Sequence, residues 1–124
     1  MDMLQEDGAS TSAERVARND AAFRDANEQI NHVAQSFDRR DGDLLPFLCE
    51  CADLRCTEVL KLTAGEYEAV RRDPTRFINA HGHVRSGKPW ARVVEELERY
   101  TVVEKLGEAA EIVAELDPRG EQPS

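Results

Sequence analysis

The sequence predicts an α+β fold: a long N-terminal helix followed by a small unit with two helices and a short antiparallel sheet. Three observations support this prediction. Apolar residues recur every seven positions from Val16 to Phe37, which is a helical spacing. Two pairs of adjacent valines, at 93–94 and 102–103, favour strands. Proline and glycine residues divide the second half of the chain into short elements, and a length of 124 residues suits one domain.

The first predicted element is an amphipathic helix over residues 11–43. Thr11 and Glu14 have the spacing of a capping box, in which side chains satisfy backbone N–H groups of the first turn. Gly42 can adopt the left-handed conformation that ends a helix. The apolar stripe between these ends consists of Val16, Phe23, Ile30 and Phe37. We expect this stripe to pack on the rest of the chain, on a second copy or on a foreign helix.

Residues 44–118 are predicted to form the small α+β unit. Pro46 favours extended backbone before it, which indicates a strand leading out of residue 45. Thr63 and Glu66 form a second capping box, for a helix that runs to about residue 72. The other predicted elements are a short strand at 77–80, a loop at 81–89, a hairpin with strands at 90–97 and 100–106, and a helix at 109–116. Residues 1–10 and 119–124 are polar and lack apolar periodicity, which predicts disordered tails.

The charge of the chain excludes some classes of partner. Its net charge is −9 and its isoelectric point about 4.8, whereas general nucleic-acid and anionic-membrane binders present basic surfaces. No run of apolar residues approaches the ~18 that a membrane span needs. The first residues also lack the basic and then apolar pattern of a signal peptide. We therefore expect a cytoplasmic protein.

Cysteine is the most informative residue type in this chain. Its three cysteines, Cys49, Cys51 and Cys56, lie within eight positions of one another. In a reducing compartment, clustered thiols are typical of metal ligands or redox groups. In an extended segment, residues two apart point to one side, so Cys49 and Cys51 can face the same ion. The five-residue step to Cys56 lets the chain turn back and supply a third sulfur.

A histidine can complete this site. Either His81 or His83, in the flexible loop that follows the predicted strand, would make a tetrahedral Cys₃His site, which suits Zn²⁺. The residues alone leave open two other interpretations, free buried thiols and a redox pair between Cys56 and one of the other cysteines. An iron–sulfur cluster is disfavoured because it usually needs four thiolates.

The expected chemistry of such a site is structural. Four protein ligands leave no position for water or substrate, which catalytic zinc needs. The chain also lacks the metalloprotease and zinc-deaminase signatures, a phosphate-binding glycine loop and a nucleophile elbow. We therefore expect no enzymatic activity. If only the cysteines bound the ion, a zinc hydrolase would become conceivable.

Several short motifs between residues 14 and 119 resemble a family of small, largely uncharacterised bacterial proteins. The specific part is Cys-x-Cys-x₄-Cys followed by Gly-His. The matching pieces are Arg18-Asn19-Asp20, Phe23-Arg24, Asn27-Glu28, Phe47-Leu48-Cys49-Glu50-Cys51 with Cys56, Leu62-Thr63, Glu66-Tyr67-Glu68, Val70-Arg71, Pro74, Arg76-Phe77, Gly82-His83, Val102-Val103-Glu104-Lys105 and Asp117-Pro118-Arg119. The resemblance implies zinc binding. Because relatives read Pro-Gly-His-Glu at positions 81–84, it also favours His83 over His81 as the fourth ligand.

These observations predict a small zinc-stabilised protein-interaction module. We expect a regulatory or adaptor protein that docks a larger partner, or a second copy, through its N-terminal helix. A basic face is a second candidate surface, formed by Arg71, Arg72, Arg76, Arg85 and Lys88. The alternative is a regulator that senses redox state, in which oxidation of the thiolates releases zinc.

Overall fold

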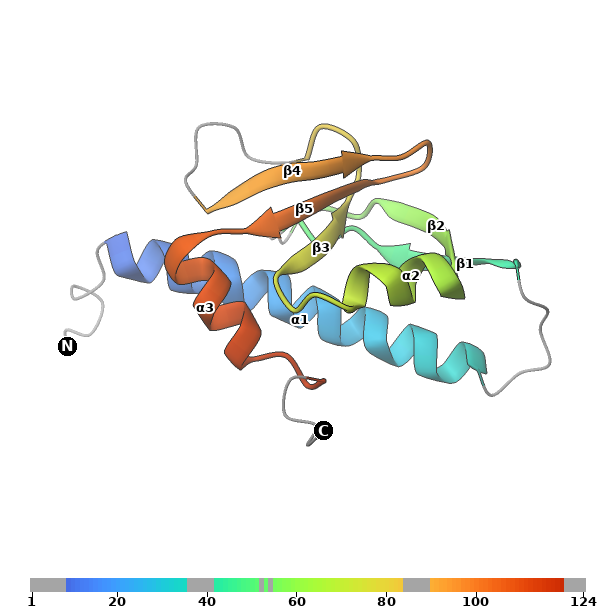
Figure 1. Ribbon diagram of the computed structural model, residues 1–124, viewed down its shortest axis with the longest axis horizontal. Coiled ribbons are helices and arrows are strands. Elements are labelled where there is room, and N and C mark those ends of the chain that lie inside the picture. Colours follow the sequence, from blue (N-terminus) through green and yellow to red (C-terminus); the bar gives the residue numbers. More distant parts are fainter. Residues whose placement is uncertain (1–8, 36–41, 52, 54, 84–89, 120–124) are drawn as a thin grey trace.

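The computed structural model describes residues 9–35, 42–51, 53, 55–83 and 90–119, and it has the predicted α+β fold (Figure 1). The elements in chain order are α1 (Ala9–Gln35), β1 (Leu44–Leu48), β2 (Val59–Thr63), α2 (Ala64–Arg71), β3 (Arg76–Asn79), β4 (Ala91–Glu96), β5 (Thr101–Lys105) and α3 (Gly107–Glu115). None of the helices in these ranges is long and apolar enough to span a membrane.

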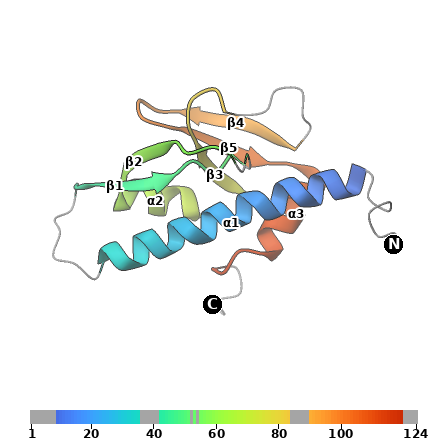
Figure 2. The same cartoon turned by 180° about the vertical axis from the view of Figure 1, so that it is seen from behind.

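The strands form two small antiparallel sheets, β1–β2 and β3–β5–β4. Helix α1 runs along the molecule on one side of both sheets, as the two opposite views show (Figures 1 and 2). Helix α3 packs on the N-terminal half of α1, and β1 lies over its C-terminal half. The long helix therefore connects the two sheets.

Most elements of the small unit follow their local sequence signals. The capping box at Thr63 and Glu66 is present, with both reciprocal hydrogen bonds, and α2 begins directly after it. The strand after residue 44, the hairpin and the last helix are also confirmed. Strand β2 was not predicted. Its exposed and buried residues alternate, as is typical of a strand. The pattern was missed because it is only five residues long and its last residue is already the N-cap of α2.

The ends of α1 differ from the prediction. The helix begins at Ala9, so Thr11 lies inside it and is not its N-cap. At the other end, the described helix reaches Gln35, and Phe37 lies outside the described residues. Gly42 does have the expected left-handed backbone, with φ of 94°.

The buried face of α1 is also not the predicted one. Val16, Phe23 and Ile30 are only half-buried and lie on the flank of the buried face. Its centre consists instead of small and polar side chains, namely Ala13, Ala17, Asp20, Ala21, Arg24, Asn27 and Asn31. Buried polar groups are tolerated when they have hydrogen-bond partners, and here other elements supply those partners. Periodicity of apolar residues cannot reveal such an interface.

Each buried polar side chain of α1 reaches a different part of the fold. The Arg24 guanidinium lies over the Phe77 ring and donates to the backbone oxygens of Pro74 and Val113, both at 2.8 Å. The Asp20 carboxylate forms a buried ion pair with Lys105 on β5, at 2.5 Å. Polar contacts thus attach α1 to β5, to α3 and to the turn before β3.

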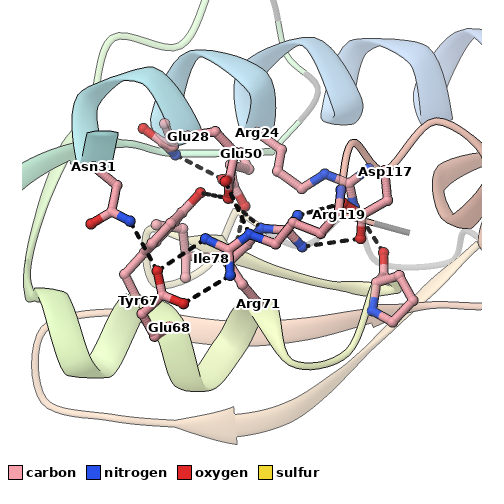
Figure 3. A network of polar contacts seen from close by, with 12 residues as sticks. Arg24, Glu28, Asn31, Glu50, Tyr67, Glu68, Arg71, Ile78, Asp117 and Arg119 are labelled. Carbon is pink, nitrogen blue, oxygen red and sulfur yellow. Dashed lines mark hydrogen bonds and ion pairs between the residues drawn. The ribbon is translucent and has the colours of Figure 1, made fainter. Parts of the chain in front are cut away.

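A second polar network joins α1, α2 and the segment after α3 (Figure 3). The buried Arg71 guanidinium donates to Glu28 and to Asp117, in both cases at 2.6 Å. Burial, the largest single cause, would raise the pKa of both carboxyls. The hydrogen bonds and positive charge of Arg71, together with further hydrogen bonds from Tyr67 and Arg119 to Glu28 and from the Arg119 N–H to Asp117, outweigh it and lower both pKa values. Arg119 donates to Glu28 and Glu68.

This network removes Arg71 from the predicted basic face. Arg71 is buried between carboxylates, and Arg76 forms ion pairs with Asp73 and Glu104. Arg85 and Lys88 lie outside the described residues. Of the three described members of the predicted face, Arg71 is therefore excluded, Arg76 is paired with carboxylates, and Arg72 is exposed.

Candidate metal centre

The three cysteines and His83 lie together at one side of the core. Their ligand atoms are all within 4.8 Å of one another. The His83 Nδ1 atom is 3.4 Å from the Cys49 sulfur and 3.6 Å from the Cys56 sulfur. Cys49 and Cys51 are buried, whereas Cys56 and His83 are half-buried. All three cysteines are free of disulfide bonds. The cluster therefore has the composition that the sequence predicted.

The first two cysteines are positioned by the continuation of β1 between the two sheets. The Cys49 N–H donates to the backbone oxygen of Glu58, which extends the β1–β2 pairing by one residue. The next N–H, of Glu50, donates to Ile78 on β3. Because this backbone is extended, Cys49 and Cys51 point to the side of the cluster, as expected from their spacing.

Tight turns deliver the other two ligands. The Cys56 N–H donates to the backbone oxygen of Asp53 at 2.9 Å, so the chain reverses just before this cysteine. After β3, the His83 N–H donates to Ala80 at 3.0 Å across a turn that contains Gly82. Gly82 has φ of 81°, which side chains with a Cβ rarely adopt. This turn brings His83, two positions beyond His81, to the cysteines.

His81 faces a different part of the molecule. Its Nδ1 lies 2.8 Å from the Thr101 hydroxyl oxygen, and its Nε2 lies 3.2 Å from the backbone oxygen of Glu98. The His81 residue itself is exposed. Of the two histidines that the residue pattern left open, the structure therefore brings His83 to the cysteines and holds His81 against the β4–β5 hairpin.

The donor types of the cluster suit a metal ion, although burial opposes the ionisation of two of the thiols. Burial raises the pKa of the Cys49 and Cys51 thiols, and the neighbouring cysteines raise the pKa of Cys49 further. Opposing this, the Ala80 N–H donates to the Cys49 sulfur at 3.1 Å, which favours the thiolate. Three thiolates this close repel one another unless a positive ion lies between them. Because a coordinating metal deprotonates its thiols outright, the donor set fits a metal ion.

Sequence reasoning did not identify two buried residues beside the cluster, Asn27 and Glu50. Glu50, between the first two cysteines, is 1% exposed and accepts hydrogen bonds from Asn27 and from the Ile78 N–H. Burial raises its pKa to about 7, although both hydrogen bonds favour the charged form. The available signal was a carboxylate in the extended segment after β1, at the position between the two cysteines, whose side chain points away from both.

Comparisons with known proteins add no name to this arrangement: no protein-family model, curated protein or solved structure matches the chain.

Proposed function

We propose that this protein is a small zinc-stabilised interaction module, with Cys49, Cys51, Cys56 and His83 as the ligands of one Zn²⁺. The convergence of these four donors supports the proposal. Thiolate and imidazole groups are the preferred ligands of structural zinc, and four of them complete a tetrahedral site. Reduced thiols also fit a cytoplasmic location, which is part of this proposal.

The role proposed for the ion is to hold three segments together. Cys49 and Cys51 follow β1, Cys56 precedes β2, and His83 follows β3, 34 positions after Cys49. Small domains often need such a link, because their cores alone supply only a few kcal/mol. When bound, zinc would join the β1–β2 sheet to the end of β3.

The alternatives receive less support from this arrangement. A zinc hydrolase needs an open coordination position, which a fourth protein ligand would occupy. A redox sensor needs thiolates that an oxidant can reach; Cys49 and Cys51 are buried, and Cys56 is half-buried. A structural ion is therefore the function that the geometry supports best.

The proposed docking surface is the exposed flank of α1 near its C-terminal end. Val33 is 50% exposed there, to the same degree as Leu44 and Val59 on the strands. Together with Gln29, Ile30 and Ala34, Val33 lines an open hollow of about 420 Å³. An apolar surface on a helix suits a helix of a larger partner or of a second copy.

The zinc proposal is tested by elemental analysis and cobalt substitution. Protein purified without added metal or chelator should contain one zinc per chain. The Co²⁺ form should show the absorption of a closed tetrahedral site with three sulfurs and one nitrogen, and it should not change when azide or another small anion is added. Purified protein without zinc that also fails to take up Co²⁺ would contradict the proposal, and a spectrum that responds to anions would favour the hydrolase.

The docking proposal is tested by crosslinking in cells. A photoactivatable phenylalanine analogue placed at position 33 should yield a discrete crosslinked product. The same analogue at position 111, an exposed position on α3, is the matched control and should yield none. Equal products at both positions, or no product at position 33, would exclude docking through this part of α1 and would leave the zinc proposal intact.

A further inference from the structure

Three hydrogen bonds hold Glu50, the residue between the first two cysteines, in place. One carboxylate oxygen accepts the Ile78 N–H at 2.9 Å, and the other accepts the Asn27 side-chain amide at 2.7 Å. The Glu50 N–H donates to the Ile78 backbone oxygen at 2.8 Å. Both Glu50 and Ile78 are fully buried, and Glu50 points toward the α1 side of the fold (Figure 3). These bonds fix the residue whose neighbours on either side are ligands.

Asn27 on α1 holds the residue before Cys49 in a similar way. Its side-chain oxygen accepts the Leu48 N–H at 2.8 Å, and its side-chain nitrogen donates to the Leu48 backbone oxygen at 2.9 Å. The carboxamide thus pairs with the open edge of β1 as a neighbouring strand would. Because Asn27 is completely buried, these bonds have little competition from water. Residues on both sides of Cys49 are therefore attached to α1.

We infer that Asn27 and Glu50 are positioning residues of the metal centre, which orient Cys49 and Cys51 so that both sulfurs face one ion. This inference rests on the proposed zinc site. Neither side chain is a ligand, and both act through the backbone that carries the ligands. Groups that hydrogen-bond directly to ligand side chains typically change metal affinity about 10–100-fold when they are replaced, and we expect an effect near the lower end of this range for groups that act through the backbone. By reciprocity, the bound ion would in turn strengthen the attachment of α1.

The hydrogen-bond chemistry of this pair allows a test by exchange. Glu50→Gln places an NH₂ group opposite the NH₂ group of Asn27, and Asn27→Asp places two carboxylates opposite each other. In the double variant, the carboxylate introduced at position 27 can accept a hydrogen bond from the amide introduced at position 50, so the pair is restored with its roles exchanged. We expect each single variant to bind zinc roughly tenfold or more weakly than wild type. The double variant should recover part of this loss, because the Leu48 oxygen still lacks its donor.

A matched control lies one turn further along α1. Asn31 donates to Glu68 on α2 at 2.9 Å, the same kind of bond at a place away from the cysteines. Zinc affinity is measured in all variants by competition with a chromogenic chelator, and the Co²⁺ absorption bands are recorded. We expect Asn31→Asp to destabilise the fold and to leave the shape of the Co²⁺ bands unchanged. Glu50→Gln and Asn27→Asp should shift these bands.

The outcomes separate this inference from the zinc proposal. Wild-type protein that binds no zinc would overturn the proposed function. If wild type binds zinc, and Glu50→Gln has the same zinc affinity and the same Co²⁺ absorption bands, only the positioning role would be overturned. If neither single variant folds, the double variant decides. Zinc binding by the double variant would support the inference, and zinc binding no stronger than that of Glu50→Gln or Asn27→Asp would contradict it.

Discussion

Cys51→Ser is expected to abolish zinc binding and to unfold most of the protein at ambient temperature. Structural zinc contributes an apparent stabilisation of about 10–16 kcal/mol in small zinc-binding peptides. That is as large as the whole stability of a typical domain, about 5–15 kcal/mol. Because α1 is attached to the metal-binding segment through Asn27, its helical signal should decrease with the rest. Circular dichroism during heating, with zinc content measured on the same sample, provides the readout.

Ala109→Ser is the matched control for this variant. Ala109 is also buried and would also receive a hydroxyl, but it lies on α3, in a separate core cluster with Phe77 and Val103. The Ala109→Ser variant should melt a few degrees below wild type and should still contain one zinc ion per chain. Removal of zinc from wild type by a strong chelator should reproduce the effect of Cys51→Ser. Identical melting before and after verified removal would show that the ion does not support the fold.

Arg71→Met should destabilise the protein by about 3–5 kcal/mol, which is typical when one partner of a buried ion pair is removed. The Arg71 side chain is 1% exposed, and the carboxylate of Asp117 beside it is 2% exposed. Methionine fills much of the space but leaves Glu28 and Asp117 without their shared donor. Arg72→Met, at the exposed neighbouring position, is the control and should change stability by less than about 0.5 kcal/mol. Urea unfolding at saturating zinc measures both.

The same pair of variants tests the electrostatic origin of this effect. In wild type the folded pKa values of Glu28 and Asp117 lie below their unfolded values, which are about 3.9–4.3. Their contribution to stability is therefore complete above about pH 5 and is lost as the pH falls through the folded values. Without Arg71 both pKa values should rise, because Arg71 supplies the largest of the contributions that lower them. Between pH 6 and pH 3, Arg71→Met should thus lose less stability than Arg72→Met, and equal losses would contradict the assignment.

Local signals explain the parts of the fold that could be predicted. A capping box acts within one helical turn, so Thr63 and Glu66 predicted the start of α2. The valine pairs predicted the hairpin for a similar reason, because strand preference is a property of adjacent residues. The candidate metal centre was predictable to the same extent, since the spacing of three cysteines is local. The choice between His81 and His83 depended on a turn, and the residue pattern by itself left it open.

The sequence by itself thus determined the fold class, most element boundaries in the second half of the chain, and the residue types that gather at the candidate metal centre. Only the tertiary structure decided how α1 is held. Asp20, Arg24 and Asn27 are polar, yet they form its buried face, because Lys105, two backbone oxygens and Glu50 lie where these side chains need partners. These partners are 23 to 89 positions away along the chain. A polar group is stable in the buried face only when these distant atoms form hydrogen bonds with it. The sequence of the helix alone does not show where such atoms will lie.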